Sequence, residues 1–310
     1  MRNKIITLTI FLLTVIGCAQ KQNKITMDEY KLKLADKIQK YDKQPYYTLQ
    51  INKQNCRVLV RINDLPFPWN FFEDEGESVL LPINNQIPKS GGQTITIEVY
   101  PMSTQTFIRN LAHVNIKLVY APDRHTPMDE FEVLKEWNLP EFLEDKKLQK
   151  YELKGTFQAQ VPFDFSEELI TAQDLSKIPD IEKKVVDKYK QLSKIIEQAD
   201  GYSFLKEIGD FNVKHWSHNY FTKKEVEANP ESENDLYNLT LLGREIAPIE
   251  NYELVFYHDN KVVVLRDKTD KSFFPKVYFW LEDEGKKEKV FVNRFIDLYM
   301  PEGSNELKVW

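Results

Sequence analysis

Cysteine and glycine are scarce in this sequence, and each scarcity argues against a class of protein. The 310 residues include only 2 Cys and 10 Gly. Two cysteines are too few for the disulfide framework of a small secreted scaffold. A phosphate-binding loop needs several backbone amides exposed by glycine, and the richest stretch, Ser90-Gly91-Gly92, is not followed by Lys-Ser or Lys-Thr. The sequence therefore predicts neither a disulfide scaffold nor a nucleotide-binding protein.

An excess of positive charge is also absent. The chain has 42 Lys+Arg against 48 Asp+Glu, a formal net charge of −6. Nucleic-acid binding requires a clustered positive surface, so a nucleic-acid partner is not expected. The hydrophobic content of 42% is enough to bury cores that offset chain entropy, which argues against disorder. Because one core rarely organises more than about 250–300 residues, we expect two domains.

The long apolar run of this chain lies at its amino terminus. After two basic side chains, residues 5–16 are apolar or threonine. As a helix this run would rise only about 18 Å, short of the roughly 30 Å hydrocarbon core of a bilayer, so it is typical of a secretion signal. It ends in Val15-Ile16-Gly17-Cys18. These four residues resemble the lipobox of bacterial lipoproteins, which implies that residues 1–17 are a signal peptide and that Cys18 is lipidated.

This resemblance predicts the location of the protein, which is expected to be anchored to a membrane of the cell envelope. Residue 20 is Gln rather than Asp, so the outer membrane is favoured, with the protein facing the periplasm or the cell surface. Removal of residues 1–17 takes away Arg2 and Lys4 and leaves 40 basic side chains against 48 acidic ones, a net charge of −8. Cys56 is then the remaining free thiol, and its strand-like surroundings predict a buried structural cysteine.

The first half of the mature chain predicts an all-β domain. Residues 18–45 are interpreted as the lipidated cysteine, a tether and a short helix opened by the capping-box spacing of Thr26 and Glu29. Residues 46–165 contain short alternating runs separated by turn residues, the pattern of a jelly-roll or immunoglobulin-like β-sandwich. Within them, residues 121–145 are expected to form an insertion with a short helix from Thr126 through Trp137.

Part of this region is similar to a known type of sandwich. A strand into the turn Ile62-Asn63-Asp64-Leu65-Pro66 is followed by Leu81-Pro82-Ile83-Asn84-Asn85-Gln86-Ile87, by Gly91-Gly92 and by another alternating strand. This order resembles the middle of the galactose-binding-like jelly rolls that accompany many glycosidases. The resemblance implies a fold and no ligand residues.

The second half predicts an α+β domain, residues 180–310, after a linker at 166–179. A helix opened by Asp180 is expected to run to Asp200-Gly201, followed by helices at 202–210 and 234–244. From residue 252 onward, strands with hairpin turns at 258–261 and 283–286 predict an antiparallel meander with helices on one face. This order of elements resembles the cone-shaped NTF2-like fold.

Aromatic residues at one predicted loop form the candidate binding site. Phe67, Trp69, Phe71 and Phe72 lie within six residues, and rings exposed on a rigid scaffold can stack on sugars or anchor a protein. The alternative is that they plug the end of the sandwich or bury against the second domain. The acidic run that follows, residues 73–77, lacks the alternating spacing of a calcium loop, so a solvated acidic tip is favoured.

Three histidines are the candidates for chemistry. His215 and His218 would share a helix side, but no third metal ligand is identifiable and a loop between two helices is the simpler interpretation. His258 precedes Asp259 in a predicted turn. No catalytic triad, metal site or cofactor is predicted.

We therefore expect a non-catalytic, lipid-anchored binding protein for a protein or glycan partner. A narrower hypothesis is an immunity-type protein that neutralises a basic toxin. The alternative is an envelope hydrolase or sugar-active enzyme that uses His215, His218 or His258, which requires at least three polar groups to meet in one pocket.

Overall fold

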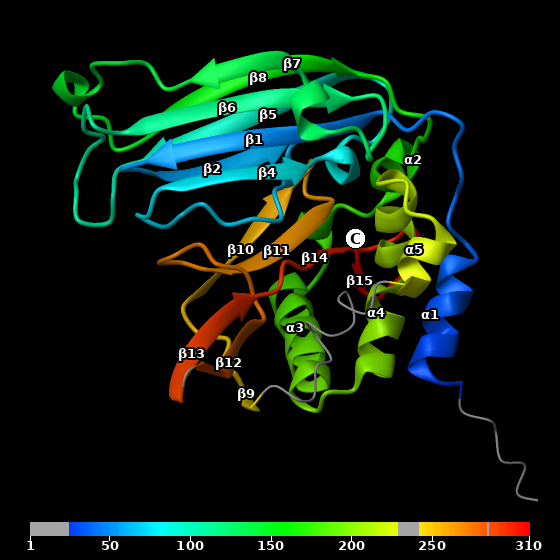
Figure 1. Cartoon of the computed structure of the whole chain (residues 1–310). Coiled ribbons are helices and arrows are strands. Elements are labelled where there is room, and N and C mark those ends of the chain that lie inside the picture. The colour runs from blue at the N-terminus through cyan, green and yellow to red at the C-terminus, as the bar shows by residue number, and fades with distance from the viewer. Residues whose placement is uncertain (1–24, 229–241, 284) are drawn as a thin grey trace, which may run out of the picture.

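Two four-stranded antiparallel sheets form most of the first half of the chain (Figure 1). The computed structural model describes residues 25–228, 242–283 and 285–310, so Cys18 and its lipobox lie outside the described residues. The sheet orders are β4-β1-β6-β7 and β3-β2-β5-β8. The strands are β1 Tyr46–Gln54, β2 Arg57–Ile62, β3 Leu65–Pro66, β4 Glu77–Pro82, β5 Gly91–Tyr100, β6 His113–Ala121, β7 Glu132–Asn138 and β8 Tyr151–Ala159.

One hydrophobic core joins these two sheets. Side chains alternate along β2, where every second residue is buried, as a strand with one face on a core requires. Leu49 and Ile116 from one sheet and Val58 and Ile97 from the other are fully buried in the same cluster. The expected run of short antiparallel strands over residues 46–165 is confirmed.

The helix expected over residues 126–137 is wrong. Only Met128–Glu130 forms a 3-10 turn, and Glu132–Asn138 is the edge strand β7, paired with β6. The β6–β7 register shifts at Leu118/Val119, and this irregularity interrupts the strict alternation of a strand. The half-buried positions of β7 therefore recur three residues apart, at Leu134 and Trp137, a spacing that resembles a helix.

The second half combines helices with two further antiparallel sheets. Its helices are α2 Ser166–Thr171, α3 Ile181–Glu197, α4 Gly201–His218 and α5 Lys223–Ala228. Its strands are β9 Leu242–Ile246, β10 Tyr252–Tyr257, β11 Val262–Asp267, β12 Lys276–Asp283, β13 Lys286–Asn293, β14 Asp297–Tyr299 and β15 Lys308–Val309. The sheet orders are β10-β11-β14-β15 and β13-β12-β9, so the strands are antiparallel and both predicted hairpins form. The single meander expected is wrong, because β11 pairs with β14 and leaves β12 and β13 to a separate sheet with β9.

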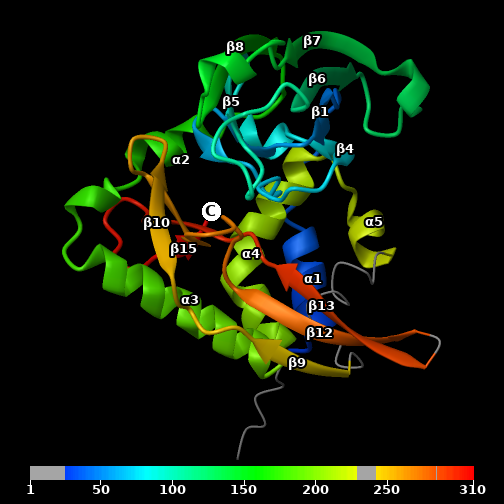
Figure 2. The same cartoon turned by 90° about the vertical axis from the view of Figure 1, so that its left-hand side faces the viewer.

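A second core fixes α3 against these strands. Val185, Tyr189 and Leu192 of α3 are fully buried together with Val263 and Leu298 of the β10-β11-β14-β15 sheet. The buried Tyr189 hydroxyl donates to the carbonyl of Ile296 and accepts from the amide of Leu265 at 3.1 Å. Figure 2 shows the first-half sheets stacked above α3 and α4.

Three further expectations about the second half need adjustment. Helix α4 continues to His218 rather than ending near residue 210, so His215 and His218 lie on a helix and not in a loop. Residues 166–179 contain α2 and a 3-10 turn, with Leu169 and Leu175 buried. Of the helix expected at 234–244, residues 242–244 belong to β9, and residues 234–241 lie outside the described part.

The first described helix packs on the second half of the chain. Helix α1, Met27–Ala35, begins with the predicted capping box of Thr26 and Glu29. Its Leu34 and Ala35 are buried with Trp216 of α4 and Val226 of α5. The described part of the chain therefore begins against the C-terminal helices before it enters the β-sheets, and this arrangement brings the two halves together.

Polar contacts join the two halves at several points. The Asn84 side chain accepts from the amide of Tyr47 at 2.9 Å and donates to the carbonyl of His218, at the end of α4, also at 2.9 Å. The amide of His258 donates to Asp64 Oδ2 at 2.9 Å. Two hollows lie along this junction, and they contain most of the functional candidates.

Candidate functional site

The predicted aromatic segment divides into three core rings and one surface ring. Phe67, Phe71 and Phe72 are 2%, 1% and 7% exposed, whereas Trp69 is 47% exposed. A backbone hydrogen bond of 2.9 Å from Val58 of β2 to Phe71 holds the segment on the sheet. Arg57 covers the ring of Phe72 at 4.5 Å. Of the four candidate binding residues, Trp69 is thus the one available to a partner.

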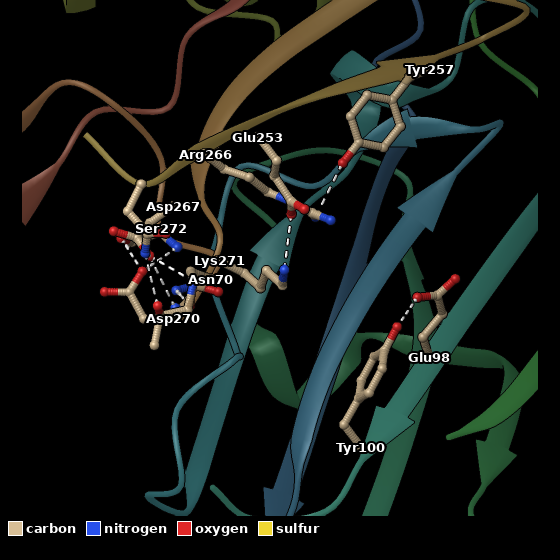
Figure 3. A network of polar contacts seen from close by, with 12 residues as sticks. Asn70, Glu98, Tyr100, Glu253, Tyr257, Arg266, Asp267, Asp270, Lys271 and Ser272 are labelled. Atoms are coloured by element: carbon tan, nitrogen blue, oxygen red, sulfur yellow. Dashed lines mark hydrogen bonds and ion pairs between the residues drawn. The ribbon is translucent and has the colours of Figure 1, made fainter. Parts of the chain in front are cut away.

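Trp69 stands beside a cleft between the two halves, here called the Trp69 cleft. Its indole Nε1 donates to Glu77 Oε1 at 3.0 Å, which orients the ring. The cleft has a volume of about 210 Å³. One wall comes from β2 and β5 and the other from β10 and β11 (Figure 3). Side chains from two distant parts of the chain therefore face one space.

The β2–β5 wall carries a paired charge cluster. Arg61 contacts Glu98 at 3.0 Å and Asp64 at 3.1 Å. Glu98 also accepts from Lys150 at 2.8 Å and from the Tyr100 hydroxyl at 2.6 Å. Burial raises the pKa of Glu98, but these hydrogen bonds and the neighbouring positive charges outweigh burial, so the pKa lies below its usual value.

The β10–β11 wall repeats this pattern with different residues. Glu253 accepts from Arg266 Nε at 2.6 Å and from Lys271 at 3.0 Å. Burial again raises the pKa of Glu253, and the two cations again lower it further, to a net decrease. Arg266 also donates to the hydroxyl of Tyr257 at 3.5 Å. Figure 3 shows this group across from the Glu98–Tyr100 pair.

The carboxylates at the Trp69 cleft do not have the raised pKa of the general acid in glycoside hydrolysis. Glu98 lines the cleft, Glu253 pairs with the lining Arg266, and the pKa of each lies below its usual value. An exposed indole beside planar guanidinium and carboxylate groups suits a ligand with an apolar face and many hydroxyls.

The acidic segment beside Trp69 is built around an internal cation. Lys53 has no exposed side-chain surface, and its amine donates to the carbonyl oxygens of Glu73 at 2.8 Å and Glu75 at 2.6 Å. Burial, then a hydrogen bond with Glu77, raises the pKa of Glu73 to about 7. Rather than a simple solvated tip, this loop closes over the ammonium of Lys53. No group of three or more metal-ligating side chains occurs among the described residues.

Two of the three candidate histidines meet in a second hollow, here called the histidine cavity. His215 and His218 line it together with Lys214 of α4 and Asp297 of β14. His258 does not line it, and lies instead in the β10–β11 turn, where its amide contacts Asp64. Sequence reasoning missed Asp297 and Lys214, although an acid inside the apolar run of residues 295–300 was a usable signal.

Both cavity histidines are neutral. Burial, followed by the charge of Arg124, lowers the pKa of His215 to about 4, and burial with the charges of Lys214 and His215 lowers that of His218 to about 3. His218 is stacked between Phe163 and Phe165, with ring centroids at 4.3 and 4.6 Å.

Cys56 is buried, and burial raises the pKa of its thiol to about 11, so it is an inert structural cysteine. Within the described ranges, no helix combines the length and apolarity needed to cross a bilayer.

Comparisons with known protein families, with curated proteins and with solved structures found no match.

Proposed function

We propose that this chain is a lipid-anchored protein of the bacterial cell envelope that binds a glycan through the Trp69 cleft without catalysing a reaction. The observation that carries the proposal is the exposed Trp69 at the mouth of a cleft with two charged walls. The location in the cell envelope is inferred from the lipobox resemblance of residues 15–18, and the outer membrane is favoured. A protein partner is the alternative occupant, since one large side chain would also suit about 210 Å³.

The same proposal includes the finer fold assignments. The two sheets that share one core fit a jelly-roll sandwich, and the helices followed by antiparallel strands fit an NTF2-like arrangement. These assignments rest on element order and on the resemblances described above. Domain limits near residues 46–165 and 180–310 remain predictions.

One binding experiment tests the proposal. The soluble form from Ala19 onward is titrated with envelope glycan fragments, and Trp69→Ala is expected to weaken capture about tenfold or more because it removes the stacking face. Trp280→Ala is the matched control, since Trp280 is 39% exposed and lies outside the cleft. Equal affinities for the two variants would contradict the proposal. Binding of an envelope protein with loss at Trp69 would favour the protein partner.

The anchor is tested on the full-length chain. Cys18→Ala is expected to move the protein from the membrane fraction to the soluble fraction, because the acyl chains supply about 0.8 kcal/mol per buried CH₂. A Cys56→Ala variant controls for the loss of a thiol and should stay in the membrane fraction. Membrane association of Cys18→Ala would contradict the lipoprotein assignment.

The alternative, an envelope hydrolase, has one observation in its favour, the convergence of His215, His218, Lys214 and Asp297. The lowered pKa values make both imidazoles weak bases, and among the described residues that line the cavity none is Ser, Thr or Cys. Binding is therefore the better proposal. The narrower immunity-type hypothesis rests on the lipobox resemblance and the net charge of −8, and binding of a basic toxin by the form from Ala19 onward would support it.

A further inference from the structure

The apolar part of the histidine cavity is lined mainly by rings. Phe165, Phe211, Phe295 and Trp310 line it, together with Leu65, Pro66 and Pro68. Its volume is about 130 Å³. An engineered apolar cavity of about 150 Å³ stays dry and binds benzene, so this space matches a single six-membered ring. Size and lining together favour a small cyclic molecule over a peptide or an extended chain.

One buried acceptor in the wall lacks a partner. Gln86 is 8% exposed, and its Oε1 atom is buried without a hydrogen bond. A native structure rarely leaves such an atom unpaired, because its lost hydration is not replaced. Gln86 follows Asn84 and Asn85 in a 3-10 turn whose contacts with α4 set its position. Gln86 also lines the cavity, so a rotation of its side-chain amide turns this unpaired acceptor toward a donor group of a ligand.

Donors face the same space. Lys214 lies 3.4 Å from both oxygens of Glu168, a long contact, and 3.7 Å from the centroid of the Trp310 ring. Asp297 is 5% exposed and, within the described part of the chain, its carboxyl accepts a hydrogen bond from its own backbone amide alone. Burial raises the pKa of Asp297 to about 7, so below that pH its carboxyl carries a proton that it can donate.

The two histidines position other residues of the cavity wall. The Asn85 side chain accepts from Asn219 at 3.1 Å, so its amide nitrogen faces His215 Nδ1 at 2.6 Å. His215 Nδ1 therefore accepts, and the ring proton is on Nε2. His218 keeps Phe165 in place by stacking. Both imidazoles act as positioning residues.

We propose that the histidine cavity binds a small, uncharged, hydroxylated ring of phenol size, with the ring between Phe165, Phe211 and Phe295 and the hydroxyl at Gln86. Once the Gln86 amide has rotated toward the ring, the hydroxyl donates to Gln86 Oε1 and accepts from Lys214 or Asp297. A cationic ligand would meet the ammonium of Lys214, which already covers Trp310. An anionic ligand would have to compete with Glu168 for that ammonium and would lose its hydration among the rings of the wall.

This site is separate from the Trp69 cleft, although Pro66 lines both. The proposal goes beyond glycan binding and does not depend on it. The Trp69→Ala substitution alters the cleft and leaves the lining of the cavity unchanged. Failure of one proposal is therefore distinguishable from failure of the other.

The test compares two rings of similar size on the full soluble chain at pH 6. Phenol and toluene are titrated and followed by calorimetry and by the indole NMR signals. We expect phenol to bind about tenfold more tightly than toluene, because one additional hydrogen bond in a buried site contributes about one factor of ten. The Trp310 indole signal should shift and that of Trp69 should not. No binding of either ring, or a shift confined to Trp69, would overturn the proposal.

Two variants identify the polar groups. Gln86→Leu should lower phenol affinity about tenfold, to the level of toluene, and leave toluene affinity unchanged. Gln105→Leu is the matched control, because Gln105 Oε1 is also buried and unpartnered but lies outside the cavity. Lys214→Met, which keeps the length of the side chain, should also reduce the phenol preference. A folded Gln86→Leu protein with unchanged phenol affinity would overturn the assignment, and so would an equal loss in Gln105→Leu.

Discussion

The Trp69 cleft and the histidine cavity lie on either side of Pro66 and handle polar groups in opposite ways. In the cleft, Glu98 and Glu253 each accept from at least two cationic or hydroxyl donors, and the pKa values of both are lowered. In the cavity, Gln86 Oε1 has no partner and the pKa of Asp297 is raised.

This difference in the pairing of polar groups indicates which kind of ligand each space suits. Paired charges hold a surface rigid and let it present an aromatic face at little ordering cost. Unpaired groups in an apolar space carry a desolvation penalty that a matched ligand can relieve. The charged cleft therefore fits recognition at its mouth, and the cavity fits enclosure of a small molecule.

The largest effect is expected for Asp297 in the cavity, where the free energy of unfolding should depend on pH. A folded pKa of about 7 against an unfolded 3.8 means that its contribution to stability is full below pH 3.8 and is lost as the pH rises through 7. Asp297→Asn should therefore gain stability relative to the natural chain by about 1.4 kcal/mol per pH unit from about pH 4 to 7, and then level off. Urea unfolding at several pH values measures this gain, and parallel curves for the two proteins would contradict it.

His218 should show the opposite sign. Its folded pKa of about 3 lies below the ordinary 6.5, so its contribution is full above pH 6.5 and is lost as the pH falls toward 3. His218→Phe keeps a ring between Phe163 and Phe165 and should gain about 1.4 kcal/mol per pH unit relative to the natural chain below pH 6.5, over the range in which both proteins stay folded. Phe165→Leu disturbs the same ring stack without removing a titratable group, so it provides the control and should show no comparable slope. A slope in both variants would indicate a general effect of disturbing the stack.

The smallest effect belongs to the cleft, where removal of one charge should destabilise. Arg266→Met leaves Glu253 with Lys271 alone and is expected to cost about 1–3 kcal/mol, because hydrogen bonds to a charged group are lost in a half-buried place. The exposed pair of Lys183 and Asp187 supplies the control, since Lys183→Met should leave the free energy of unfolding nearly unchanged. Equal unfolding free energies for both variants would remove the distinction between the cleft and an ordinary charged surface.

Local patterns of the sequence predicted much of the fold. The strict alternation of β2 and β5 follows from burial on one face, and the box of Thr26 and Glu29 marks the start of α1. The β10–β11 turn was readable because His258, Asp259 and Asn260 include residues that tolerate positive φ, which all three adopt. The strand β7 was not readable, because its irregular pairing with β6 replaces alternation by a spacing of three.

The candidate site was predicted only in part for a similar reason. The aromatic segment was visible, but the sequence could not distinguish Trp69 at the surface from Phe71 in the core, since both flank the same turn. Lys214 and Gln86 carried no local signal at all. Their significance arises from α4 lying against the 3-10 turn of residues 84–86, a contact between segments about 130 residues apart.

The sequence by itself determined the predicted address at Cys18, the acidic balance, and the strand and helix patterns, because charge, apolar length and periodicity act over neighbouring residues. Tertiary structure alone decided which ring is exposed, which carboxyls are paired, and which polar atoms are left without partners. Burial and hydrogen bonding depend on which distant segments pack together, and desolvation, rather than residue type, sets the pKa values of Asp297 and His218.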